Sequence, residues 1–321
     1  MIGKTNAVVG ESVDFTEMDE LLDRLEIAVG EYQLEPEEEY FLTFSSSEPF
    51  TLMAMPNWDG ELQYSTDKET WNTWDDEEIS SGSNNELYLR GIGNTEIATY
   101  FELSGDDDIS CTGNIENLLD YETVELGNHP VMANDCFSGL FMECTLLTVA
   151  PELPATTLAQ SCYAHMFYGC TSLINAPSLP ATTLADYCYN AMFFGCTSLE
   201  TAPALPATTL EYICYNNMFY GCTSLTMLPA LPATALAQYC YNNMFRNCTL
   251  IKISETQTGE YQNAYRIPTS GTGVVESDWN ANMFTGTGGT FTSAPTINTT
   301  YYTSNAIINP DGTITPAVQG V

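Results

Sequence analysis

Residues 195–220 read GCTSLETAPALPATTLEYICYNNMFY, and nearly the same 26 residues stand on either side of them. Good copies occupy 169–194 and 221–246, a copy that diverges at its start occupies 143–168, and a partial copy appears at 279–286 after an insertion. Two series of cysteines mark the period: Cys144, Cys170, Cys196, Cys222 and Cys248, and Cys136, Cys162, Cys188, Cys214 and Cys240. A fixed period of this length is typical of structural repeats that stack on one another.

The apolar spacing within one repeat predicts its local structure. Leu184, Cys188 and Met192 recur at i, i+4 and i+8, which predicts one face of a short helix, and Gly195 is placed to end it. The Thr-Ser-Leu-x-x-Ala-Pro segment is expected to be extended, and Pro180 to turn the chain back. Because one such unit cannot bury its own apolar face, we expect the units to stack and their extended segments to form a parallel ladder about 4.8 Å apart.

The repeat resembles the BspA-type, or Treponema-type, leucine-rich repeat. The resemblance rests on Gly-Cys-Thr-Ser-Leu with Met-Phe just upstream, and it covers roughly residues 130–250. The form with Leu-Pro-Ala-Thr-Thr-Leu is similar to repeats in gut bacterial and bacteriophage proteins. The resemblance implies a right-handed solenoid with a strand-lined concave face, and a surface-exposed protein that binds proteins or host cells.

We therefore predict an α+β fold: a leucine-rich-repeat solenoid preceded by a short helix and a small antiparallel β-sandwich module. Strands are expected at 40–44, 50–54, 61–64 and 86–90, with the turn signal Asp59-Gly60 between two of them. The expected divisions are an N-terminal docking or oligomerisation segment at 1–37, the β module at 38–103, an N-terminal cap at 104–130, the solenoid at 131–250, and a C-terminal cap with a β-rich tail at 251–321.

The charge balance excludes some classes of partner. Seven Lys and Arg stand against 42 Asp and Glu, for a formal charge of −35. Nucleic acid is not expected as a partner, because binding its phosphates requires a basic surface. Insertion into a membrane is not expected either, since no stretch of 18 apolar residues occurs. Residues 1–10 do not read as a secretory signal. Either a signal has been removed or the protein reaches its site without general secretion, and the initial Met favours the second interpretation.

One helix is predicted near the N-terminus. Thr16 can cap it, and one face carries Met18, Leu21, Leu22 and Leu25. Two interpretations stay open: the helix packs against the next domain, or it docks the chain to another protein or to a second copy of itself.

The side chains that could carry chemistry fall into no catalytic or metal-binding pattern. The cysteines are spaced Cys-x7-Cys, which does not suit zinc, so we expect buried free thiols, with disulfides between stacked coils as the alternative. The acidic runs at 37–39, 75–78 and 106–108 lack the alternating oxygen ligands of a calcium loop and are expected to be solvated. His129 and His165 have no nucleophile pattern beside them. We expect no cofactor, no metal and no enzymatic activity.

Two sets of residues are candidates for a ligand surface. Positions 174–175, 200–201 and 226–227 differ between repeats whose other residues agree, which suggests surface side chains and nominates Asn175, Thr201 and Met227. Tyr168, Phe194 and Tyr220 share another position, followed by Arg246. They form either an aromatic stripe that binds a glycan or protein, or a ladder that packs coil on coil.

Taken with what the resemblance implies, these observations favour a non-enzymatic virion surface protein of a gut bacteriophage, such as a head fibre, a decoration protein or a tail-associated adhesin. Its N-terminal segment would contact other virion proteins, and its solenoid would bind a host surface protein or glycan. The alternatives are a BspA-like adhesin on a bacterial cell surface or outside the cell, and a structural protein that cements neighbouring subunits without a host ligand.

Overall fold

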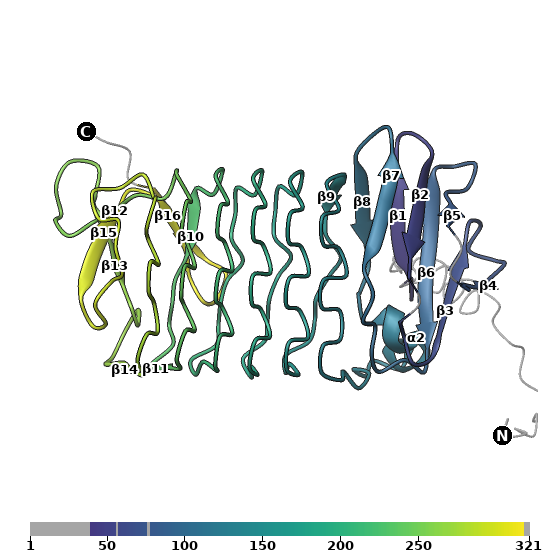
Figure 1. The fold of residues 1–321 in the computed structure, drawn as a ribbon, viewed down its shortest axis with the longest axis horizontal. Coiled ribbons are helices and arrows are strands. Elements are labelled where there is room, and N and C mark those ends of the chain that lie inside the picture. Colours follow the sequence, from purple (N-terminus) through teal and green to yellow (C-terminus); the bar gives the residue numbers. More distant parts are fainter. Residues whose placement is uncertain (1–38, 56, 76–77, 318–321) are drawn as a thin grey trace, which may run out of the picture. The chain divides into compact units, whose positions relative to one another are not determined.

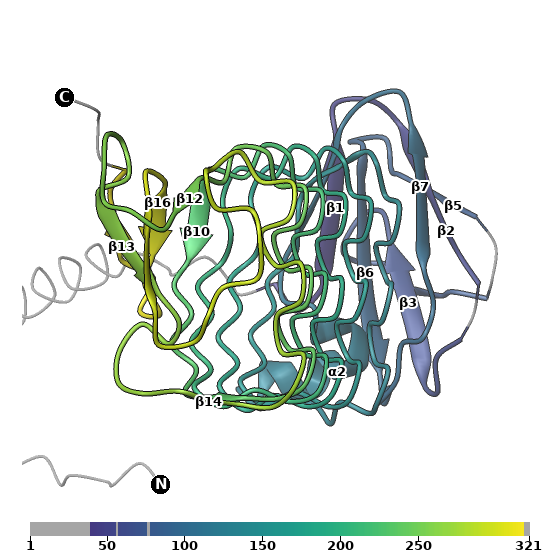
Figure 2. The ribbon, with the colours of Figure 1, turned by 60° about the vertical axis from the view of Figure 1, so that its left-hand side comes forward.

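The computed structural model describes residues 39–55, 57–75 and 78–317, and the described residues from Tyr40 onward form one compact unit. The predicted N-terminal helix with Met18, Leu21, Leu22 and Leu25 lies outside the described residues. Within them, the repeats form a row of stacked coils, each coil being one 26-residue turn of the chain (Figure 1). Figure 2 shows successive coils following nearly the same path.

Backbone hydrogen bonds along one side of each coil alternate between two directions. In the coil that contains Phe193, the N–H groups of Cys188, Asn190, Met192 and Phe194 donate to the carbonyl three residues back in the same coil. The N–H groups of Tyr187, Tyr189, Ala191, Phe193 and Gly195 instead donate to the carbonyl 25 residues ahead, in the next coil. We call this segment, residues 186–196 and its equivalents, the turn ribbon. Five bonds join each neighbouring pair of ribbons from Ser161 to Asn247.

The short helix predicted in each repeat is wrong, because the structure has consecutive turns there. Every fourth residue of the ribbon has a left-handed backbone: φ is 61° at Tyr187, 51° at Ala191 and 73° at Gly195. Such residues interrupt a right-handed helix at a cost of about 1–2 kcal/mol for a side chain other than glycine. The bonds to neighbouring coils offset that cost. The spacing of Leu184, Cys188 and Met192 is therefore the four-residue period of turns, not the 3.6-residue period of a helix.

Aromatic rings fill the core behind the turn ribbon in two columns. One column stacks at centroid distances of 5.5–5.7 Å and interplanar angles of 3–11°, and comprises Phe141, Phe167, Phe193, Phe219, Phe245 and Phe284. The other comprises Phe137, Tyr163, Tyr189, Tyr215 and Tyr241. All of these side chains are buried. Each ring thus packs against its own counterpart in the neighbouring coils.

All eleven cysteines lie in the described residues, and each is a buried free thiol. In one series the sulfur donates to a backbone carbonyl of the preceding coil. Cys196 Sγ lies 3.0 Å from Phe167 O, and Cys222 Sγ lies 3.0 Å from Phe193 O. The thiol at this position is therefore both a small apolar side chain and a hydrogen-bond donor between coils.

Two sheets stand at the start of the coils, and all their strand pairs are antiparallel except the last pair of the larger sheet (Figure 1). The strands predicted at 40–44, 50–54, 61–64 and 86–90 are present as β1 (Leu42–Ser46), β2 (Phe50–Ala54), β3 (Glu61–Ser65) and β6 (Glu86–Ile92). The larger sheet has the order β4-β3-β6-β1-β8-β9, with β4 at Asn72–Thr73, β8 at Ile109–Thr112 and β9 at Leu147–Val149. The smaller has the order β5-β2-β7, with β5 at Ile79–Ser80 and β7 at Phe101–Gly105.

The larger sheet runs directly into the first coil. β8 pairs antiparallel with β1 on one side and parallel with β9, which belongs to the first coil, on the other. Phe101 of β7 packs edge-to-face on Phe141 at 5.5 Å, and its carbonyl accepts the thiol of Cys144 at 3.1 Å. Phe101 therefore stands where a preceding coil would place its own phenylalanine. The expected boundary between residues 103 and 104 falls inside β7.

The helix α2 (Asn117–Glu125) packs on β6 next to the first coil, and its path is kinked at Asp120. Gly91 of β6 permits this contact, because a Cβ there would lie 1.7 Å from the carbonyl oxygen of Leu118. Within the described residues, no helix has the length and apolar character needed to span a membrane.

The C-terminal region adds one more turn ribbon, residues 278–286, which is the last rung of the stack. Residues 278–285 accept the bonds of the ribbon at 239–247. Four of the five bonds reach 38 residues ahead instead of 25, which leaves an insertion between the two. Short strands surround this rung: β11 (Ala235–Leu236) with β14 (Val274–Val275), and β12 (Ile253–Ser254), β15 (Thr300–Thr303) and β13 (Asn263–Arg266) in a second group. β10 (Met227–Pro229) pairs in parallel with β16 (Ala306–Ile308), which pairs with β17 (Ile314–Thr315).

Replacing Phe193 with Ala should destabilise the protein by about 3–5 kcal/mol, because the ring is buried between two stacked neighbours. Chemical denaturation measures the loss. Phe193→Leu, which retains apolar volume, should cost less, and the exposed Glu200→Ala should stay within about 0.5 kcal/mol of the parent. A loss below about 1 kcal/mol for Phe193→Ala would contradict the burial of this ring between two stacked neighbours.

The thiols should be unreactive in the folded protein. Burial raises the pKa of Cys144, Cys188 and Cys248 to about 12, so these groups stay protonated at pH 8 and present no thiolate nucleophile. We expect no reaction with a chromogenic aromatic disulfide at that pH in buffer, and eleven reactive thiols per chain in denaturant without reductant. Fewer than eleven would show that some cysteines form disulfides.

Candidate binding surfaces

The positions that vary between repeats lie together on one side of the stack. We call Ile174, Asn175, Glu200, Thr201, Thr226 and Met227 the variable face. Its backbone is held in parallel register: Asn175 pairs with Thr201, and Thr201 pairs with Met227. The N–H of Glu200 donates to Ile174 O at 2.9 Å, and that of Thr226 donates to Glu200 O at 3.0 Å. The structure therefore brings Asn175, Thr201 and Met227 together in one row.

Exposure differs sharply between the variable face and the residues beside it. Ile174, Asn175, Glu200 and Thr226 are exposed, and Ile174 retains 44% of its accessible surface, whereas Thr201 and Met227 are half-buried. The preceding residue of each repeat is an invariant leucine that is completely buried, at Leu173, Leu199 and Leu225. Packing therefore fixes the residue type at one position and leaves its neighbour free to differ. The row ends where Met227 pairs with Ala306 of β16.

The second candidate set, Tyr168, Phe194 and Tyr220, forms a stacked column at the outer side of the turn ribbon. We call these three residues the aromatic stripe. Their centroids are 4.6 and 4.5 Å apart, with interplanar angles of 5° and 13°. The three rings are half-buried, and the Arg246 guanidinium lies 5.5 Å over the Tyr220 ring. Among the described residues, no hydrogen bond or ring contact joins this stripe to the variable face.

Stacking limits what the aromatic stripe can bind. A sugar ring recognised by an aromatic side chain lies on the face of that side chain, and both faces of Phe194 are already covered by Tyr168 and Tyr220. Arg246 covers one further face, that of Tyr220. Only ring edges remain available along most of the stripe. This geometry favours the interpretation in which the stripe packs coil on coil, and makes the variable face the stronger candidate.

Charge is distributed unevenly between the two sheets and the coils. Residues 39–152 contain 23 Asp and Glu and only two basic residues, whereas residues 153–250 contain three acidic residues and Arg246. Both basic residues of the first segment lie against aromatic rings: Lys68 against Phe41 and Tyr88, and Arg90 against Trp71 and Tyr121. The surface of the coils is therefore nearly uncharged and rich in hydroxyl and amide groups, while the preceding sheets carry most of the negative charge.

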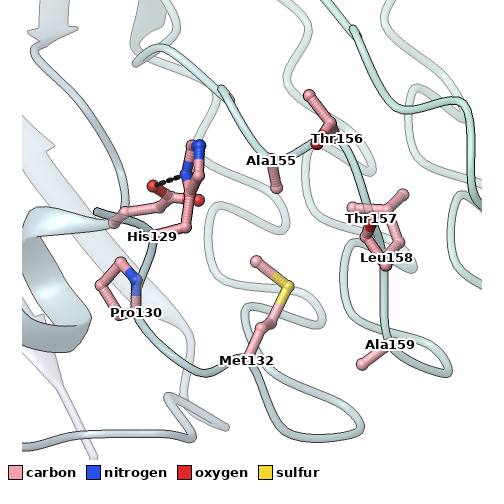
Figure 3. A pocket seen from close by; sticks show the side chains of 9 residues that line it. His129, Pro130, Met132, Ala155, Thr156, Thr157, Leu158 and Ala159 are labelled. Atoms are coloured by element: carbon pink, nitrogen blue, oxygen red, sulfur yellow. Dashed lines mark hydrogen bonds and ion pairs between the residues drawn. The ribbon is translucent and has the colours of Figure 1, made fainter. Parts of the chain in front are cut away.

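No metal site is apparent in the described part of the chain, where no three His, Cys, Asp or Glu side chains come together in a suitable group. A pocket of about 390 Å³ does lie between the segment that follows α2 and the first coil. Figure 3 shows His129 and Pro130 on one side of it, Thr156–Ala159 on the other, and Met132 between them. The carboxylate of Glu116 lies beside His129, with 2.7 Å between Glu116 Oε2 and His129 Nδ1.

Comparisons with protein-family models, with curated proteins and with solved structures find no match to this chain.

Removing the middle ring of the aromatic stripe should reduce stability. Phe194 loses two stacked neighbours in Phe194→Ala, and each aromatic pair contributes about 0.5–1.5 kcal/mol beyond the area it buries. We expect the free energy of unfolding, measured in urea, to fall by roughly 1–3 kcal/mol. Phe194→Tyr should lose less, because it keeps an aromatic ring of the same type as its two neighbours. An alanine variant as stable as the parent would mean that the stripe is not a packing ladder.

Proposed function

We propose that this chain is a non-enzymatic binding protein, a leucine-rich-repeat solenoid of the BspA type, that presents its variable face to a protein or a glycan. The observation that carries the proposal is the contrast within each repeat between an invariant buried leucine and the exposed residues that follow it. Ile174, Glu200 and Thr226 differ in chemistry, yet their backbones share one parallel register. A rigid backbone that displays differing side chains is well suited to specific recognition.

The nearly uncharged coil surface supports a ligand that is recognised by hydrogen bonds and apolar contact. The variable face offers a carboxylate at Glu200, an amide at Asn175, hydroxyls at Thr201 and Thr226, and an exposed aliphatic side chain at Ile174. Proteins and neutral glycans both present matching groups. A polyanion such as nucleic acid is disfavoured by the overall charge of −35.

The setting we propose is the surface of a gut bacteriophage particle. This part of the proposal rests on the likeness of the Leu-Pro-Ala-Thr-Thr-Leu repeat to repeats of phage proteins. In that setting the N-terminal segment contacts other virion proteins, and the variable face contacts the host. Two alternatives to this setting can be tested. The first is a BspA-like adhesin on a bacterial cell surface, and the second is a cement protein without a host ligand.

Substituting the exposed residues of the variable face should abolish ligand binding without unfolding the chain. We expect Ile174→Ala, Glu200→Ala and Thr226→Ala together to weaken binding of the fluorescent full-length chain to host cells at least about tenfold, because each removes an exposed contact group. The matched control changes three exposed residues of another side of the stack, Thr182, Thr183 and Thr208, to Ala. Flow cytometry measures binding. Unchanged binding of the variant with the three variable-face substitutions would show that this face does not bind the ligand.

The virion setting is tested separately with an antibody raised against the chain. Immunogold electron microscopy of purified particles whose genome encodes the chain should show label on the particle surface. Label on the bacterial envelope instead would favour the adhesin. Labelled particles that adsorb to hosts equally well with and without the variable-face substitutions would favour the cement protein.

A further inference from the structure

The pocket beside α2 contains a carboxylate that the protein itself satisfies only in part. The Glu116 side chain is 3% exposed, although an ionised carboxylate is costly to bury unless its oxygens are paired. One oxygen, Oε2, lies 2.7 Å from His129 Nδ1, and the imidazole is itself 61% exposed. The other oxygen, Oε1, accepts no hydrogen bond from the described residues. The pocket therefore contains a largely buried carboxylate, one oxygen of which accepts no bond from the described residues and is not fully enclosed by them.

A second buried polar group near Glu116 also lacks a partner. The Tyr163 ring is completely buried in the core, and its hydroxyl has no hydrogen-bond partner among the described residues. The negative charge of Glu116 is close enough to contribute to the raised pKa of that phenol, after the larger effect of burial. Equivalent tyrosines of the following coils have no carboxylate near them in this way. The region around Glu116 thus contains a second polar group, able to donate and to accept, that is unpaired among the described residues.

The remaining walls of the pocket are largely apolar. Met132, Leu158, Pro130 and Ala155 line it, with the hydroxyls of Thr156 and Thr157 beside them. A volume of about 390 Å³ admits a small molecule or one side chain of a partner. The ligand that matches these walls is an aliphatic chain that ends in a positive charge.

We propose that this pocket binds the side chain of a lysine of a partner protein, with the ammonium group donating to Glu116 and the aliphatic stem lying against Met132 and Leu158. Arginine fits less well, because its planar fork pairs best with both oxygens of a carboxylate and His129 already occupies one. An ammonium is a compact charge that needs a single oxygen. The acidic segment 39–152, which contains Glu116, raises the local concentration of cationic groups.

This site does not depend on the proposed function. Glu116 and His129 lie outside the variable face, so a chain that loses host binding through Ile174, Glu200 and Thr226 retains the lysine pocket. Loss of the pocket likewise leaves the variable face intact. The two proposals can therefore fail separately.

The experiment uses the full chain and a pair of small probes. Nα-acetyl-lysine amide supplies the stem and the ammonium, and Nα-acetyl-norleucine amide supplies a stem without the charge. Isothermal titration calorimetry should detect binding of the lysine probe only. Glu116→Gln, which keeps the shape of the side chain and removes its charge, should weaken that binding at least about tenfold. Glu125→Gln, on the exposed end of α2, should leave it unchanged.

A second measurement on the unmodified sequence guards against a variant that fails to fold. With ¹³C-methyl-labelled methionines, the lysine probe should shift the NMR signal of Met132, which lines the pocket, and not that of Met142, which lines another. Equal binding of the norleucine probe, full binding by a folded Glu116→Gln variant, or an unshifted Met132 signal at saturating probe would each overturn the proposal.

Discussion

The alternation of backbone donors in the turn ribbon is the interaction on which the rest of the structure depends. One N–H closes a turn within its coil, and the next reaches the following coil. This pattern requires a left-handed residue every fourth position, as at Tyr187 and Ala191, and it sets each coil directly over the one before. The aromatic columns and the thiol-to-carbonyl bonds follow, because equal residues are held at equal places in successive coils.

The sequence was sufficient to predict the period, the partial copy at 279–286 and the strands at the start of the described chain. Those features depend on residue types that recur along the chain or alternate between faces. The helix in each repeat could not be distinguished from turns, since Leu184, Cys188 and Met192 are spaced by four and a helical face tolerates that spacing. The difference is decided by the neighbouring coil, which accepts the N–H groups that a helix would use internally.

Candidate surfaces were predictable to the extent that one repeat can be compared with another. The row of Asn175, Thr201 and Met227 could be found because variation among otherwise equal units marks positions outside the close-packed core, although only Asn175 of the three is fully exposed. Comparison of repeats could not tell whether the rings of Tyr168, Phe194 and Tyr220 present faces or edges. Glu116, and its pairing with His129, were missed for a different reason. They lie outside the regular repeats, and the other wall of their pocket comes from Thr156–Ala159, so only the folded chain brings the parts together.

Direction is a further property of the ribbon. From Ser161 to Asn247, every bond between neighbouring ribbons has its N–H on the earlier coil and its carbonyl on the later one. The peptide dipoles of these bonds therefore add, as they do along a helix axis. Their positive end lies at the rung of residues 278–286, and their negative end lies toward the sheets that already contain most of the carboxylates. The described chain is consequently electrically polar along the stack, and its two ends present different potentials to any molecule that approaches.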